Sequence, residues 1–114
     1  DGPVQAVGRT ASRDQTVEDV TIHKGDPALV VLASANRDPK IFNASNRFNV
    51  NRTGPAPLSF GYGAHYCLGA NLARAQLRAL FGQLLSTLPD IQADEPTFLG
   101  GNFIHGVASM PCHF

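Results

Sequence analysis

The sequence predicts an α+β fold in which short strands and turns lie on either side of one long helix. Three observations support this prediction. The first third of the chain alternates short apolar runs with Gly and Pro turns, residues 67–88 have helical periodicity, and the tail alternates apolar and polar residues between glycines. At 114 residues the chain has the size of one ordinary domain.

The part of the chain before residue 58 is predicted to be a small strand region followed by an irregular segment. Residues 1–35 form the strand region, and Lys24-Gly25-Asp26-Pro27 is expected to be a turn within it. The strands expected there lie at residues 4–7, 16–22 and 28–32. Residues 36–57 are rich in Asn, Arg, Pro and Gly and have no sustained period, so a meander is expected.

The second half is predicted to contain a loop, the long helix and a β tail. Residues 58–69 form the loop, and Gly61 and Gly63 bend it. The helix is expected over 67–88, with Pro89 after its end. The apolar positions that define its buried face are Leu68, Leu72, Ala75, Ala79, Leu84 and Leu88. Residues 91–114 are expected to form a β-hairpin and a closing strand.

Composition and charge exclude several classes of protein. Apolar residues make up 43% and charged residues 16%, and nine basic residues balance nine acidic ones without a block of like charge. Neither nucleic acid nor a charged membrane surface is therefore an expected partner. No apolar run is long enough for a membrane span and no signal peptide is recognisable, so a cytoplasmic location is expected. Two cysteines in unlike contexts do not suggest a disulfide framework.

The loop before the helix carries the most informative pattern. It is expected to deliver Cys67 to the first turn of the helix, where unpaired amide hydrogens and a partial positive charge stabilise a thiolate. Gly61 and Gly63 would let the backbone bend and point amides at the sulfur, and Gly69 leaves room for a flat ligand. The physical chemistry suits a thiolate that binds a metal.

This loop resembles the haem-binding signature of the cytochrome P-450 family, Phe-x-x-Gly-x-His/Arg-x-Cys-x-Gly. The residues that match its fixed positions are Phe60, Gly63, His65, Cys67 and Gly69. The resemblance extends forward through residues 72–74 and back through residues 36–39 and 48–52, which covers essentially the whole chain. It implies the C-terminal, haem-binding part of that fold, in a bacterial-type member.

The resemblance implies haem b as the cofactor, with Cys67 as the ligand of the haem iron. It also implies that Arg9 and His65 hold the propionates by charge-assisted hydrogen bonds and that Phe60 packs beside the ligand loop. The full set expected to bind the cofactor is Arg9, Phe60, Gly61, Gly63, His65, Cys67 and Gly69. No residue of the chain is predicted to be catalytic.

Two apolar segments are similar to those that project into the family's substrate pocket. Their residues are Val4, Gln5, Ala6, Val7, Phe103 and Ile104. The resemblance therefore implies a monooxygenase that activates dioxygen and hydroxylates a hydrophobic small molecule. Its electron donor would be a ferredoxin-like protein or a reductase. Arg74 and Arg78 are expected to form a solvated helix face, and the alternative is a contact with the donor, because the resemblance places this helix on the side that the donor approaches.

Some parts of the family pattern have no match in these residues. The acid-alcohol pair that delivers protons to oxygen is missing, and so is the Glu-x-x-Arg helix that pairs with the meander arginine, here Arg52. The chain is therefore expected to be a truncated portion that is inactive alone. Because it would expose a large apolar face, it is expected to self-associate, to associate with a missing N-terminal portion, or to have low stability. The alternative function is a non-catalytic haem-binding or interaction module.

Two other interpretations of the motifs are weaker. His65, Cys67, Cys112 and His113 could ligate zinc, although the usual Cys-x-x-Cys or His-x-x-x-His spacing is missing. Gly61 and Gly63 resemble part of a dinucleotide loop, but the third glycine and the following acidic residue are missing. The dinucleotide interpretation is rejected.

Overall fold

A computed structural model describes residues 2–114, which divide into two compact units. Unit 1 contains the residues up to Ser59 together with Asn102–Ile104. Unit 2 contains Phe60–Gly101 and His105–Phe114. Mixed short strands and one long helix confirm the α+β prediction.

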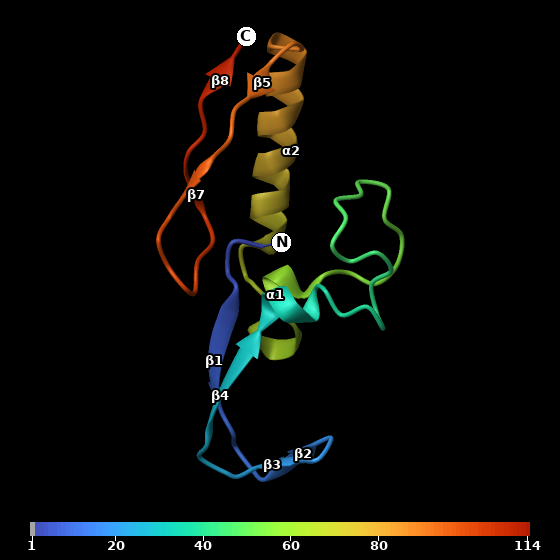
Figure 1. The fold of residues 1–114 in the computed structure, drawn as a ribbon, viewed down its shortest axis with the longest axis vertical. Coiled ribbons are helices and arrows are strands. Elements are labelled where there is room, and N and C mark those ends of the chain that lie inside the picture. Colours follow the sequence, from blue (N-terminus) through green and yellow to red (C-terminus); the bar gives the residue numbers. More distant parts are fainter. Residues whose placement is uncertain (1) are drawn as a thin grey trace. The chain divides into compact units, whose positions relative to one another are not determined.

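Unit 1 is built on two antiparallel strand pairs. Strand β1 (Ala6–Thr10) pairs with β4 (Pro27–Val31), and Gly25, with φ +94°, turns the chain just before β4. Strand β2 (Gln15–Val17) pairs with β3 (Val20–Ile22) at the far end of the β1–β4 ribbon (Figure 1).

The prediction of one strand over residues 16–22 is wrong. The chain reverses at Glu18, which has φ +51°, and Thr16 then lies opposite Thr21. Two acidic residues between Val17 and Val20 are better placed in an exposed turn than in a strand, which explains the reversal.

A short helix joins the sheet to the meander. Helix α1 (Leu32–Ala35) begins directly after β4 and places Leu32 in the small core of this unit, with Phe42. No helix or strand occurs between residues 36 and 57, as predicted. Asn36 links the start of this segment to the residues that follow its end. Its Oδ1 accepts a hydrogen bond from Leu58 N at 2.7 Å, and its Nδ2 donates to Ser59 Oγ at 3.1 Å.

Unit 2 contains the long helix α2 (Ala70–Thr87). Two 3-10 turns precede this helix: η1 (Leu58–Phe60), which lies at the boundary of the two units, and η2 (Gly63–His65). Its residues are mostly Ala, Leu, Gln and Arg, which favour helix, and Pro89 follows its end. The predicted start at residue 67 is three residues too early, because Gly69 is the N-cap residue. Cys67 and Leu68 stay in the turn before the helix.

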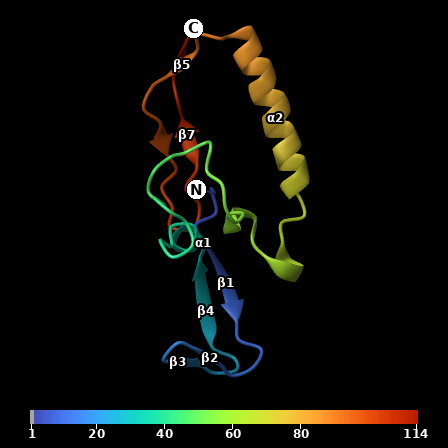
Figure 2. The same cartoon turned by 90° about the vertical axis from the view of Figure 1, so that its right-hand side faces the viewer.

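The tail forms two short antiparallel ladders. Strand β5 (Gln92–Ala93) pairs with β8 (Cys112–His113), and β6 (Thr97–Phe98) pairs with β7 (Val107–Ser109) inside that pair (Figure 2). The predicted hairpin is therefore present, and the closing strand is its outer partner. The rings of Phe98 and His105 stack with centroids 4.3 Å apart, which stabilises the loop between β6 and β7.

Apolar side chains of the described residues remain largely in contact with solvent. Only Leu32, Phe42 and Ala70 are buried among them, and the predicted burial of one face of α2 is not observed. Leu72 is 64% exposed and Leu80 60%. Within residues 2–114, no helix is both long and apolar enough to cross a membrane.

Candidate functional site

The cysteine loop is held by backbone hydrogen bonds of its own. Cys67 N donates to Phe60 O at 2.8 Å, so the loop closes on itself across the glycines. Tyr66 N donates to Gly63 O at 3.0 Å within the η2 turn. Ala70 N donates to Cys67 O at 3.2 Å, which links the loop to the start of α2. These bonds fix where the cysteine backbone lies.

The two loop glycines adopt conformations that other residues rarely adopt. Gly61 has φ +76° and Gly63 has φ +65°, both in the left-handed region. A Cβ at Gly61 would also lie 3.3 Å from His65 O. The sequence-based prediction that glycines bend this loop is therefore confirmed.

The thiol of Cys67 is free and exposed. No hydrogen bond to its Sγ occurs among the described residues, so the expected amide contacts from the glycines are not observed. A soft sulfur donor that faces solvent with no partner is chemically suited to bind iron. A Cβ at Gly69 would lie 4.0 Å from this sulfur, so the glycine keeps the space beside it free of a side chain. The donor and its surroundings thus fit a planar metal cofactor.

Sequence reasoning missed a side-chain cluster behind this loop. Arg74, from the second turn of α2, donates through Nη1 to Tyr66 Oη at 3.1 Å, and its guanidinium carbon lies 4.7 Å from the Phe60 ring centroid. The rings of Phe60 and Tyr66 are tilted at 57° with centroids 6.4 Å apart. Arg74 is therefore more than a solvated helix residue, whereas Arg78, one turn later, makes no such contact.

The two residues expected to hold propionates are both exposed. His65 ends the η2 turn, and its ring has no partner among the residues described. Arg9 belongs to unit 1, where its Nη1 donates to Gly8 O at 2.7 Å. Arg9 also lines an open cavity of about 480 Å³ with Thr10, Ala11, Ser12, Arg13, Gln15, Ile22 and Ala28. A second cation, Arg13, and two hydroxyl side chains make this cavity suited to an anionic group.

The structure brings together the two segments expected to contact substrate. Val4 and Ile104 form an antiparallel bridge, and Gln5 N donates to Phe103 O at 2.8 Å. Ala6 and Val7 continue this segment into β1. Phe103 is 59% exposed and Ile104 54%, so an apolar surface is available there.

Arg52 organises the meander. Its guanidinium donates to the carbonyl oxygens of Asn43, Ala44 and Arg47, through Nη2 at 3.0 Å for Ala44 and 2.8 Å for Arg47. Ala44 has φ +48°, an unfavourable conformation for a residue with a Cβ. The arginine therefore holds a strained loop in place.

The zinc interpretation receives no support from the residues described. They contain no cluster of three or more metal-ligating side chains. Cys112 donates to Met110 O at 3.5 Å, and His113 pairs with Asp94 at 2.8 Å, so both are used within the tail. Neither cysteine forms a disulfide.

Comparisons with known proteins agree with the resemblance of the loop. The family model for cytochrome P450 matches residues 2–91. Cytochrome P-450-terp of a Pseudomonas species is 34% identical over 113 residues, which are 98% of this chain and 26% of that protein. The polyketide biosynthesis cytochrome P-450 PksS of Bacillus subtilis is 37% identical over 112 residues, which are 95% of this chain and 28% of that protein.

A solved structure shares the fold of the chain. A Mycobacterium marinum cytochrome P-450, in complex with pseudoionone, superposes with a TM-score of 0.93 and 45% identity. The match covers 98% of this chain and 27% of that one. The chain therefore spans about a quarter of the length of these relatives.

Proposed function

This chain belongs to the cytochrome P-450 family, and we propose that it is the haem-ligating part of a haem-thiolate monooxygenase with Cys67 as the iron ligand. Members of the family bind haem b. The observation that carries the proposal is the free, exposed thiol of Cys67 on a loop closed by the bond from Cys67 N to Phe60 O. Thiolate-ligated haem supplies oxygen activation, since the sulfur donates electron density that favours O–O cleavage.

The remaining cofactor contacts follow from the placement of the loop residues. Gly61 and Gly63 supply the bend, Gly69 leaves the space beside the sulfur open, and Phe60 anchors the start of the loop. His65 is exposed and without a partner, so its ring is free to donate to a propionate. Arg9 has the cationic group for the second propionate, and its role is supported by the basic cavity that it lines.

A hydrophobic small molecule is the proposed substrate class. Val4, Val7, Phe103 and Ile104 are apolar, and the backbone pairing of the two segments holds them in one place. Such a surface favours apolar ligands through burial of nonpolar area. An electron-donor protein, ferredoxin-like or a reductase, is the proposed partner, and a cytoplasmic location is proposed.

Turnover by the chain alone is not expected. No acid-alcohol pair that could move protons to bound oxygen is recognisable in its sequence. The extensive exposure of Leu72, Leu80 and their neighbours on α2 supports association with further polypeptide, because monomers rarely expose large apolar patches. Haem binding is therefore the activity to measure first.

Haem titration of matched cysteine variants tests the proposal. Cys67 and Cys112 are both free and exposed, so Cys112→Ser is a control for the loss of a thiol. We expect stoichiometric haem uptake by the wild type and Cys112→Ser, and an affinity more than about tenfold lower for Cys67→Ser. Equal uptake by the two variants would contradict ligation by Cys67.

A further inference from the structure

We infer that Arg74 and Tyr66 are positioning residues for Cys67, acting as a clasp that pins both ends of the ligand loop. The clasp consists of Phe60, Tyr66 and Arg74. This inference rests on the proposed function for its consequence at the iron. Its structural part concerns the loop alone and is testable without haem.

One end of the loop is fixed through Phe60. The guanidinium of Arg74 lies 4.7 Å from the centroid of the Phe60 ring, within the range of a cation–π contact. The carbonyl oxygen of Phe60 accepts the hydrogen bond from Cys67 N at 2.8 Å. A side chain of α2 therefore restrains the residue that holds the cysteine backbone.

The other end is fixed through Tyr66, the residue directly before Cys67. Its hydroxyl accepts a hydrogen bond from Arg74 Nη1 at 3.1 Å, and its ring forms a tilted aromatic pair with that of Phe60. Tyr66 is 46% exposed, so its ring is partly covered by these contacts. One guanidinium thus contacts both residues that flank the glycine bend.

The bend needs such a restraint. Gly61 and Gly63 have more freedom in the unfolded chain than other residues, so ordering them costs more conformational entropy. Cys67 and His65 contribute no side-chain bond among the residues described. Helix α2 is the regular element that follows the loop, and the contacts of Arg74 attach the loop to this helix.

Amide hydrogen exchange of Cys67 in the chain without haem measures the clasp directly. The bond from Cys67 N–H to Phe60 O protects this amide. Removing the guanidinium in Arg74→Gln should speed exchange on the order of tenfold, and removing the hydroxyl in Tyr66→Phe about fivefold. The Tyr66→Phe change should have little further effect in the Arg74→Gln background, because the two residues act together.

Arg78→Gln is the matched control. It removes the same charge from the same exposed helix, one turn away, where no hydrogen bond, ion pair or ring contact is lost among the described residues. Exchange of Cys67 in this variant should stay within about twofold of the wild type, and so should exchange of the α2 amides in every variant. Equal effects of Arg74→Gln and Arg78→Gln, or no effect of Tyr66→Phe, would overturn the clasp.

The consequence for the iron is read from the spectrum of the haem-loaded, reduced chain under carbon monoxide. We expect Arg74→Gln and Tyr66→Phe to lower the fraction of the red-shifted, thiolate-type band, and Arg74→Lys to restore part of it. An unchanged band despite faster exchange would overturn the positioning role. A wild type without that band would refute the proposed function and the role at the iron, while exchange would still decide whether the clasp orders the loop.

Discussion

Replacement of Arg52 by Met should open the meander while leaving the rest of the chain folded. Arg52→Met removes the donors to the carbonyl oxygens of Asn43, Ala44 and Arg47 but keeps much of the length of the side chain. Ala44 then keeps its strained φ of +48° without the bonds that compensate for it. Among the described residues this guanidinium has no hydrogen bond to helix α1 or to the β1–β4 pair, so both should be unaffected.

The magnitude follows from the bonds that are lost. A net hydrogen bond contributes about 0.5–1.5 kcal/mol, so three bonds contribute about 1.5–4.5 kcal/mol. The bonds of Arg52 are solvent-exposed, so the lower part of this range applies, about 2 kcal/mol. Such a loss corresponds to a rise of about thirtyfold in the opening equilibrium of the loop.

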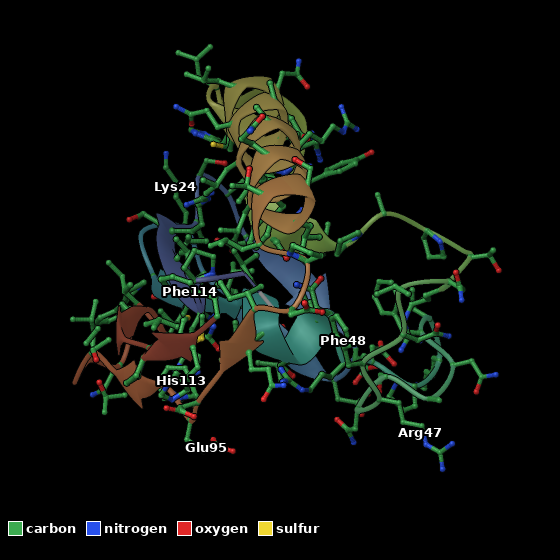
Figure 3. The ribbon with its side chains drawn as sticks, turned by 90° about the horizontal axis from the view of Figure 1, so that it is seen from above. Lys24, Arg47, Phe48, Glu95, His113 and Phe114 are labelled. Carbon is green, nitrogen blue, oxygen red and sulfur yellow. The ribbon has the colours of Figure 1, made fainter. Side chains whose placement is uncertain are left out.

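Amide exchange of Arg47 is the suitable assay, because its N–H donates to Ala44 O at 2.9 Å inside the clamped loop. Arg47→Met is the control, since the Arg47 side chain extends away from the loop (Figure 3) and is exposed. After correction for intrinsic rates, exchange should rise about thirtyfold only in Arg52→Met. A change below about twofold, or the same change in both variants, would refute this account of the meander.

Further substitutions test the backbone at two other places. Gly61→Ala should raise the free energy of the folded loop by about 1–2 kcal/mol, because Gly61 has a positive φ, and this should appear as faster exchange of the Cys67 amide. Gly82→Ala should stabilise α2 by about 0.5–1 kcal/mol in urea unfolding, because nothing lies within 4 Å of its Cβ position. A more stable loop in Gly61→Ala, or a less stable helix in Gly82→Ala, would contradict these assignments. Asn36→Ala should destabilise the meander end by about 1–2 kcal/mol, and Asn36→Asp by less, since the acid keeps the acceptor for Leu58 N; equal losses would argue against this.

Local sequence patterns predicted the parts of the fold that depend on local preferences. The helix-forming residues of α2, the meander without regular structure and the glycine bend at Gly61 and Gly63 all follow from residue type. The start of the helix was misplaced because Gly69 has no capping side chain to mark it. The turn at Glu18 was missed because the strand prediction rested on the β-branched residues of 16–22 and overlooked the acidic pair Glu18-Asp19, which favours an exposed turn.

The long-range contacts could not be predicted in the same way. The clasp depends on the reach of Arg74 across the loop to Phe60, and a helical pattern only shows that an arginine occupies a polar face. The three acceptors of Arg52 are backbone carbonyls, which every residue has, so sequence gives no signal for them. The identity of Cys67 as the metal-binding candidate, by contrast, needed only the pattern of residues around it.

Iron ligation by Cys67 is the central claim, and the carbon monoxide spectrum of the reduced, haem-loaded chain tests it most directly. Thiolate ligation predicts a strongly red-shifted Soret band in the wild type that is lost in Cys67→Ala and retained in Cys112→Ala. An unshifted band in the wild type, or a red-shifted band that survives in Cys67→Ala, would contradict the claim.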